Sequence, residues 1–203
     1  TGLTRVMAGR TAVEAAYPVG VNPERHVLAF FPFLYWPMSR EQPELSPSAI
    51  ANIDAYLKNG GTILFDTRDQ PEGGFGGGTA GTGALRRILA YLDVPPLIPV
   101  PEDHVLTQAF YLMDTFPGRY EGSPVWVVQH SGGVNDGVSS LVIGANDWAA
   151  AWALDDNGWP IATVSSNDEH QRELAFRFGI NLVMYTLTGS YKADQVHLPA
   201  IME

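Results

Sequence analysis

The order of elements between Val27 and Asp66 constrains the fold more than any other feature of this chain. Residues 27–35 (VLAFFPFLY) are apolar on both faces, which is typical of a central strand covered by helices on each side. A helix is predicted next, between the N-cap Ser46 and the stop signal Gly60-Gly61, because its apolar residues recur at helical spacing. Residues 62–66 (TILFD) then predict a second strand. This order predicts a right-handed parallel crossover, and with it an α/β fold with a doubly wound, mostly parallel sheet and helices on both faces.

Weaker patterns predict the elements that follow. Residues 84–92 place leucine and isoleucine at helical spacing, whereas the proline-rich residues 94–101 are expected to form an extended connection. Residues 125–128 and 140–144 are β-branched and apolar, so they are expected to be further strands. Between these two runs, residues 132–137 (GGVNDG) have the composition of a turn.

Two predictions concern the last part of the chain. Residues 151–162, which contain the turn sequence DDNG, are consistent with either a hairpin or the end of a short helix. A long helix is expected to begin in a capping box at residues 166–169 (SNDE) and to continue to Gly189. Residues 191–203 have no period and are expected to form a surface tail or a docking strap.

Composition excludes several classes of function. The chain has 203 residues, 45% of them hydrophobic, which suits one domain, residues 1–203, with a sizeable core. Its 12 basic and 22 acidic residues give a net charge of −10, which repels nucleic acids and anionic membrane surfaces. No cysteine is present, so disulfides, thiolate metal sites and cysteine nucleophiles are excluded. The longest apolar stretch, residues 27–36, is about half the roughly 20 residues that span a bilayer. The chain starts with Thr1, which is typical of an excised piece of a larger protein.

Polar residues that directly follow two predicted strands are the best candidates for a site, since ligands of open α/β sheets bind beyond the carboxyl ends of the strands. Asp66, Arg68 and Asp69 follow one strand, and Asn146 and Asp147 follow another. We expect these five side chains to line one crevice and to bind a polar ligand through carboxylate, guanidinium and amide groups. Asp66 or Asp69 is alternatively a general base or a ligand for a hard metal ion.

These residues also have structural interpretations. An aspartate at a strand end often shapes the turn, so Asp66 is also explained as a turn former that Arg68 neutralises. Asp147 precedes a predicted helix start at Trp148 and is the simplest N-cap for that helix. Trp148 is explained either as a stacking platform for a ligand or as a core residue. The sequence leaves these alternatives open.

Two other features carry weaker signals. Residues 73–83 (GGFGGGTAGTG) nominally match a dinucleotide-binding pattern, but the loop does not open directly off its strand, so a mobile flap, a flexible linker and an anion cradle are all open. The five histidines form no spaced metal motif, and neither a metal site nor a cofactor is expected. Only His104, which follows Glu102 and Asp103, is a candidate proton carrier.

Six short stretches, spread through nearly the whole chain, form a specific set. They are residues 30–37 (FFPFLYWP), 66–69 (DTRD), 116–120 (FPGRY), 144–149 (GANDWA), 181–185 (NLVMY) and 191–196 (YKADQV). Together they resemble the bacterial family known as domain of unknown function 4159. The resemblance implies a flavodoxin-like, class I glutamine-amidotransferase-like sheet, found as the C-terminal module of larger proteins with membrane-anchoring segments. It implies no reaction, and the cysteine of the amidotransferases has no counterpart in this chain.

We therefore expect a non-catalytic, or at least non-thiol, domain that binds a small polar ligand or a protein partner and not nucleic acid. No catalytic residue is assigned. The full-length protein is expected to be anchored in the bacterial inner membrane, with this segment as a soluble domain that does not itself span the bilayer. The alternative is a carboxylate-dependent, metal-assisted hydrolase that uses Asp66 or Asp69, with His104 as a distant helper.

Overall fold

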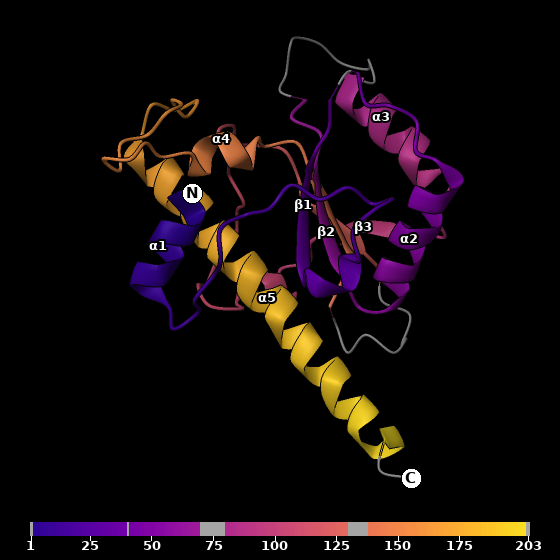
Figure 1. The fold of residues 1–203 in the computed structure, drawn as a ribbon. Coiled ribbons are helices and arrows are strands. Elements are labelled where there is room, and N and C mark those ends of the chain that lie inside the picture. Colours follow the sequence, from indigo (N-terminus) through magenta and orange to yellow (C-terminus); the bar gives the residue numbers. More distant parts are fainter. Residues whose placement is uncertain (1, 40, 70–79, 130–137, 202–203) are drawn as a thin grey trace.

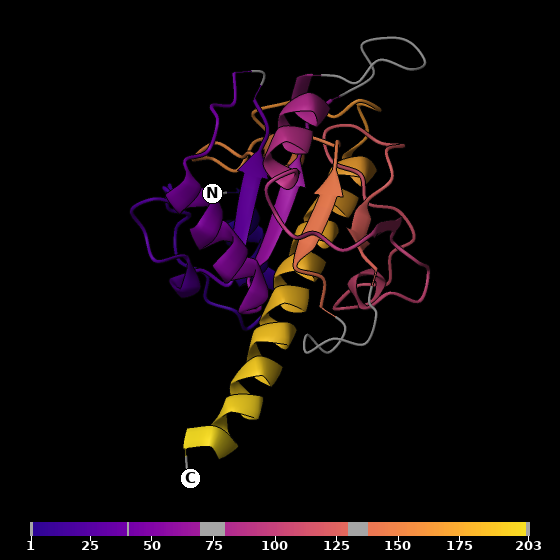
Figure 2. The ribbon, with the colours of Figure 1, turned by 90° about the vertical axis from the view of Figure 1, so that its right-hand side faces the viewer.

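The computed structural model describes residues 2–39, 41–69, 80–129 and 138–201, with side chains as far as residue 188. Within these ranges the chain forms a five-stranded sheet with helices on both faces (Figures 1 and 2). The helices are α1 (Gly2–Arg10), α2 (Pro47–Lys58), α3 (Ala80–Leu89), α4 (Trp148–Trp152) and α5 (Glu169–Ile201), with the 3-10 turns η1 (Leu28–Phe30) and η2 (Val105–Thr107). The strands are β1 (Phe33–Pro37), β2 (Thr62–Asp66), β3 (Leu97–Pro99), β4 (Trp126–Val128) and β5 (Leu141–Gly144).

The sheet is mixed. Its strand order is β1-β2-β5-β4-β3, in which β1, β2 and β5 are parallel while β4 runs antiparallel to both β5 and β3. The predicted α/β class is confirmed, and so are the strands at 62–66, 125–128 and 140–144. The expectation of a mostly parallel sheet holds only for the β1-β2-β5 half. Only 12 residues separate the end of β4 from the start of β5, which is about the minimum length that a parallel crossover requires.

Alternation of side chains along β2 divides the core into two layers. Leu64 faces the layer that the sheet forms with α4 and α5, where Trp148 and Phe178 are fully buried. Ile63 and Phe65 face the opposite layer, which contains α2 and α3. Figure 1 shows these helix pairs on opposite sides of the sheet. Burial on both faces explains why the sequence of β2 is continuously apolar.

The first half of the fold confirms one prediction and corrects another. Helix α2 starts after Ser46, whose Oγ accepts a hydrogen bond from Ala49 N at 3.2 Å, as the sequence predicts. The strand predicted at 27–35 is wrong in its first part, since η1 occupies that part and β1 starts only after Pro32. Its predicted central place is also wrong, because β1 pairs with β2 alone and lies at the edge of the described sheet. Proline explains the difference, because it has no N–H for a ladder and restricts the residue before it.

Elements near the middle of the chain also differ from prediction. The helix predicted at 84–92 exists but starts earlier, at Ala80. The segment 94–101, expected to be a plain connection, contains the short edge strand β3. Pro99 fits there because an edge strand leaves one row of its backbone groups outside the ladder. The turn predicted at 132–137 lies outside the described residues.

Helix α1 has no counterpart among the predicted elements. Its apolar residues form no clear helical stripe, so local sequence carries little sign of it. Tertiary contacts hold it instead: Met7 is buried, and Leu3 packs against the main core next to Gly179 of α5. A helix this short depends on such packing, because isolated helices of its length are marginal in water.

The region after α4 combines both interpretations that the sequence allows. Helix α4 ends at Trp152, as a short helix. An antiparallel bridge between Leu154 and Pro160 then closes a hairpin-like turn. The two interpretations of residues 151–162 are therefore compatible, because a short helix and a hairpin-like turn follow one another.

Helix α5 corrects two predictions. Its cap is Asp168, whose Oδ1 accepts a hydrogen bond at 2.9 Å from the second backbone N–H of the helix. Ser166, the predicted cap, donates its hydroxyl to Gln171 Oε1 at 2.6 Å instead. The helix continues past Gly189 to Ile201, so the expected aperiodic tail is helical as far as that residue (Figure 1). Among the helices that the structure describes, none combines the length and the hydrophobicity that a transmembrane helix requires.

Candidate functional site

The carboxyl ends of β2 and β5 lie side by side. Asp66, the last residue of β2, is paired in register with Gly144 of β5. The backbone N of Asp147 lies 3.2 Å from Asp66 Oδ1, so the two polar turns are in direct contact. The turns that carry the five candidate residues therefore meet the geometric condition for a shared site.

Asp66 is at the centre of this contact, and it is fully buried. Its carboxylate accepts four hydrogen bonds, from Tyr35 Oη at 2.8 Å, Trp148 N at 2.9 Å, Arg68 N at 3.1 Å and Asp147 N at 3.2 Å. A carboxylate offers about four acceptor positions on its two oxygens. The donors of the protein itself therefore saturate Asp66.

Asp66 caps α4, a role for which Asp147 is the simplest candidate in the sequence. Asp147 does occupy the N-cap position, but its backbone is left-handed, with φ of 51°, and its side chain makes no capping hydrogen bond. The N–H groups of residues 147 and 148 donate to Asp66, and that of Ala149 donates to the Tyr35 hydroxyl at 3.4 Å. Side chains of β1 and β2 thus satisfy the first N–H groups of α4, which a helix cannot satisfy internally.

Burial sets the protonation of this cluster. Removal from water raises the pKa of Asp66, against the lowering effect of its four hydrogen bonds. Desolvation also raises the pKa of Tyr35, and the neighbouring charge of Asp66 adds to the effect. The raised pKa keeps the Tyr35 hydroxyl protonated, and this hydroxyl donates to Asp66.

Arg68 follows the end of β2 in a left-handed conformation, with φ of 53°. Its guanidinium donates to Met38 O through Nε at 3.2 Å and through Nη2 at 2.5 Å. These bonds join the end of β2 to the residue that follows β1. Arg68 is also the most exposed of the five candidate residues, so it presents the most surface to another molecule.

Asp69 caps the start of α3. It accepts hydrogen bonds from Gly81 N at 3.1 Å and from the N and Oγ1 of Thr82 at 2.6 and 2.7 Å. Glycine is needed at position 81, because a Cβ there would lie 2.2 Å from Thr67 O. Most of the glycine-rich loop predicted at 73–83 lies outside the described residues.

Asn146 and Asp147 contact the segment that leads to β4. Asn146 is buried, and its Nδ2 donates to Phe116 O at 2.9 Å and to Ser123 O at 3.3 Å. Its Oδ1 is buried without a hydrogen-bond partner in the part of the chain that the structure describes. Asp147 Oδ2 lies 3.6 Å from Arg119 Nη1, as a loose ion pair. These contacts hold the segment against the end of β5.

Sequence reasoning does not identify three residues of this region: Tyr35, Arg119 and Gln171. Gln171, in the first turn of α5, donates through Nε2 to the O atoms of Gly118 and Arg119 at 2.9 and 3.0 Å. Tyr35 and Arg119 belong to the stretches FFPFLYWP and FPGRY, so the family resemblance was the available signal for both. No comparable signal marks Gln171.

Trp148 and His104 occupy structural positions. Trp148 is fully buried, its Nε1 donates to Phe116 O at 3.2 Å, and its ring centroid lies 4.8 Å from that of Phe178. This placement favours the core interpretation over a stacking platform. His104 lies at the start of η2, where its Nδ1 accepts a hydrogen bond from Leu106 N at 3.2 Å. Capping explains this histidine without a role in proton transfer.

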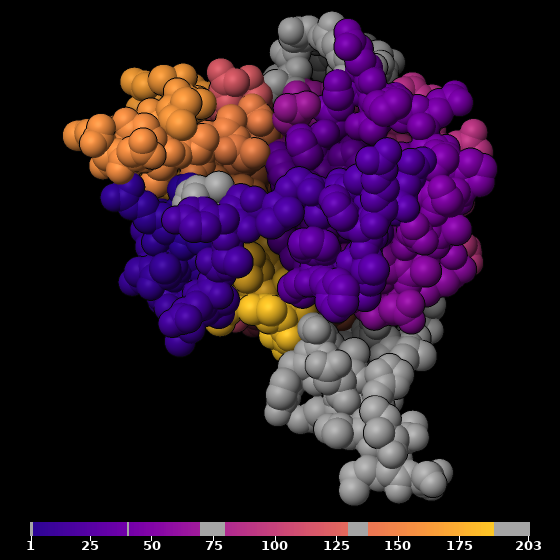
Figure 3. Space-filling view, viewed as in Figure 1, coloured from indigo at the N-terminus to yellow at the C-terminus, as the bar shows by residue number. Residues whose placement is uncertain are grey.

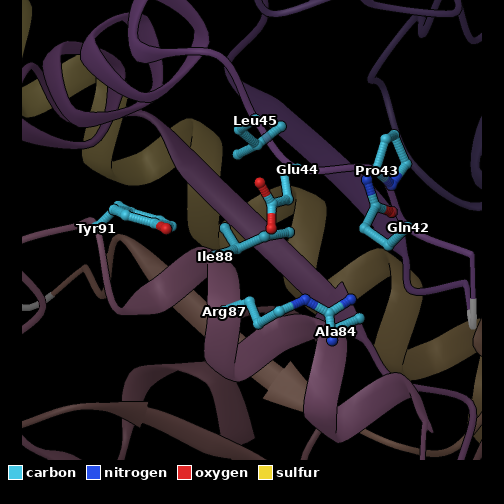
Figure 4. A pocket seen from close by; sticks show the side chains of 8 residues that line it. All are labelled: Gln42, Pro43, Glu44, Leu45, Ala84, Arg87, Ile88 and Tyr91. Carbon is cyan, nitrogen blue, oxygen red and sulfur yellow. The ribbon is translucent and has the colours of Figure 1, made fainter.

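The cavity drawn in Figure 4 lies between residues 42–45 and α3, with Glu44, Arg87 and Tyr91 in its lining. Its volume of about 20 Å³ accommodates about one water molecule. An organic ligand does not fit there. Across the described residues, no three side chains of the kinds that bind metal ions come together.

Comparison with known proteins identifies a family. A family profile described as Domain of unknown function (DUF4159) matches residues 1–187. No curated protein matches the chain. The matched region contains all five candidate residues and every contact described above.

Proposed function

The chain belongs to the family described as a domain of unknown function (DUF4159), and from this premise we propose that it is a non-catalytic interaction domain. In this proposal the domain binds a protein partner at the end of the molecule where β2 and β5 terminate. The polar residues of these strand ends serve as the rigid support of that surface.

The saturation of Asp66 is the observation that carries this proposal. A general base needs a free lone pair directed at its substrate, and a metal ligand needs one directed at the ion. Asp66 accepts four hydrogen bonds from protein groups, and Asp69 accepts at least three. Bonding of this kind stabilises turns and leaves little capacity for chemistry, which supports binding over turnover.

A small polar ligand at the same place is a narrower form of the proposal. It assigns the ligand site to the five candidate residues, Asp66, Arg68, Asp69, Asn146 and Asp147. Among them Arg68 is the most exposed, and the ion pair of Asp147 with Arg119 is loose, so these groups are the best placed to exchange an internal contact for one with a ligand. The buried members then act by holding the turns in place.

A turnover assay tests the non-catalytic part of the proposal. The purified chain is incubated with a panel of ester, phosphoester and peptide substrates, beside an Asp66→Asn variant whose folding is checked by circular dichroism. We expect hydrolysis at the buffer background for both proteins. Robust hydrolysis by the wild type that Asp66→Asn abolishes without loss of folding would make the domain an enzyme.

The raised pKa of Asp66 favours one alternative, a carboxylate-dependent hydrolase with Asp66 or Asp69 as base or metal ligand, because perturbed carboxyl groups at strand ends are common in active sites. Calorimetric titration with Mg²⁺, Mn²⁺ and Ca²⁺ separates the two functions. If the chain is an interaction domain, we expect no heat of metal binding. A saturable heat that Asp69→Asn removes supports the hydrolase.

We also infer a flavodoxin-like, class I glutamine-amidotransferase-like arrangement and a membrane-anchored setting in the full-length protein. The parallel β1-β2-β5 order and the helices on both faces support the first inference, and the family resemblance supports the second. Superposition of an experimental structure on those enzymes tests the arrangement. Fractionation of bacterial cells tests the setting: we expect the full-length protein in the inner-membrane pellet after a high-salt wash, and recovery in the supernatant contradicts it.

A further inference from the structure

The turn between α4 and α5 exposes two large apolar side chains. Trp159 is 71% exposed and Ile161 is 69% exposed. They flank Pro160, the residue in the antiparallel bridge with Leu154, so both lie on one short exposed segment. Two neighbouring apolar side chains of this size form a patch, which distinguishes them from the single exposed apolar residues that every surface carries.

Backbone hydrogen bonds hold this patch in one conformation. Asp155 N donates to Trp159 O at 2.9 Å, and Trp159 N donates to Asp155 Oδ1 at 2.7 Å. Ile161 N donates to Ala153 O at 3.1 Å. Gly158 closes the turn with φ of 88°, a conformation that side chains disfavour. A patch that is already ordered loses little conformational freedom on binding, which is a property of good binding surfaces.

The patch lies at the end of the molecule toward which β1, β2 and β5 point. Figures 1 and 2 show the chain after α4 at this end, close to the start of α5. In Figure 3 the same segment forms a projecting orange surface beside α1. The turn that carries the patch therefore lies at the same end of the molecule as the surface that the proposed function assigns to binding.

Acidic groups surround the patch. Asp155 and Asp156 precede it and are exposed. Glu169 lies on its other side, because Arg172 contacts both Ala162 O and Glu169, and the Glu169 side chain is 86% exposed. Two bases lie nearby: Arg5 donates to the backbone O of Asp156, and Arg172 is buried beneath the segment that it contacts.

We propose that the Trp159–Ile161 patch is the docking site for a protein surface that combines an apolar pocket with a border of lysine or arginine. Tryptophan is enriched among the residues that dominate binding energy, and acidic groups at the rim select a basic partner. The same charges, with the net charge of −10, disfavour an anionic membrane and a second copy of this chain. This inference rests on the proposed interaction function and names the partner class.

A peptide selection tests the inference. A library of random twelve-residue peptides displayed on phage is selected on the full 203-residue chain, and bound clones are compared on a Trp159→Ser/Ile161→Ser variant. Phe30→Ser is the matched control, because Phe30 is also a large exposed side chain, at 82%, on a different part of the surface. We expect enriched peptides that combine apolar residues with lysine or arginine. Their affinity falls at least about tenfold in the double variant and is unchanged by Phe30→Ser.

The outcomes separate this inference from the function on which it rests. Enriched peptides that bind the wild type and the double variant equally well overturn the docking site and leave the interaction domain intact. Peptides without basic residues overturn the partner class, as does affinity that Asp156→Asn and Glu169→Gln leave unchanged. Binding of the wild type to vesicles of phosphatidylcholine or phosphatidylglycerol through Trp159 overturns the protein partner. Failure to enrich any peptide counts against both proposals.

Discussion

Two turns at the same end of this molecule use opposite chemistry. The turn after β2 is polar, yet its Asp66 is fully buried and accepts four internal hydrogen bonds. The turn after α4 contains Trp159, whose side chain is largely exposed and whose backbone N and O form the hydrogen bonds within the turn. Polar residues at strand ends are the usual candidates for a site, and tryptophan is the usual candidate for a core. The comparison teaches that residue type alone does not show which turn keeps bonding capacity after folding: the polar turn uses its capacity internally, whereas the apolar turn leaves a large side chain in water.

The largest expected effect on stability comes from substitution of Asp66, the acceptor at the centre of the polar turn. Asp66→Ala leaves four donors, one buried and three partly buried, without their acceptor, so we expect the free energy of unfolding to fall by about 3–5 kcal/mol. Urea denaturation followed by tryptophan fluorescence measures it. Asp156→Ala is the control from the apolar turn, because that aspartate is exposed. Equal losses in the two variants would break the comparison.

A smaller effect is expected when one donor to Asp66 is removed. Tyr35→Phe deletes a hydrogen bond to a charged group, which contributes about 1.5–3 kcal/mol to stability. Thermal and urea denaturation measure the loss, with Tyr17→Phe as the control because Tyr17 is exposed. A loss as large as that of Asp66→Ala would mean that Tyr35, and not the carboxylate, organises the cluster.

The pH dependence of stability sharpens the comparison between a buried and a surface carboxylate. Burial raises the pKa of Asp66 above 3.8, so its share of stability is complete below that pH and declines as the pH rises through the raised value. For Glu173, the hydrogen bond from Arg10 is the largest cause of a pKa below 4.5, and the bond from Arg177 lowers the pKa further. The contribution of Glu173 to the free energy of unfolding is therefore present above pH 4.5 and is lost as the pH falls through the lowered pKa. The effect is smaller than a deletion, because both carboxyl groups stay in place.

Urea denaturation at a series of pH values measures this difference. The difference in the free energy of unfolding between wild type and Asp66→Asn should become smaller as the pH rises. The corresponding difference between wild type and Glu173→Gln should become larger. Parallel trends for the two variants would show that desolvation does not dominate at Asp66.

The smallest expected effect is at the apolar turn. Trp159→Ser removes a side chain that is mostly in water, so the free energy of unfolding should change by no more than about 0.5 kcal/mol. Differential scanning calorimetry measures it against Trp152→Ser, which removes a buried ring whose Nε1 donates to Ala175 O at 2.7 Å. A loss at Trp159 comparable to that at Trp152 would place Trp159 in the core and remove the basis for the docking surface.

Strong local signals account for the elements that the sequence predicts well. The cap at Ser46 and the run TILFD encode α2 and β2 within a few residues, and both are where expected. Elements without such signals were missed or misplaced. Helix α1 depends on contacts with α5, and β3 is a three-residue edge strand whose pairing with β4 no local pattern encodes.

The candidate site was predictable in position and not in bonding. The rule that parallel strands end at one edge of the sheet predicts that Asp66 and Asp147 lie close together, and the hydrogen bond between them shows that they do. That they bind a ligand stays a prediction. The donors to Asp66, however, come from Tyr35 and Trp148, which are 31 and 82 positions away in the chain. Bonds over such separations follow from the register of the sheet, which residue type and spacing do not determine.

The capping of α4 by Asp66 and Tyr35 has a consequence for the order of folding. A helix of five residues has no stability of its own in water, and here the acceptors for its first N–H groups belong to two strands. We therefore expect helix α4 to form only after β1 and β2 have assembled in register, and to melt together with them. Its amide protons should exchange with deuterium at the rate of the sheet, so this small helix serves as a built-in reporter of whether the sheet is whole.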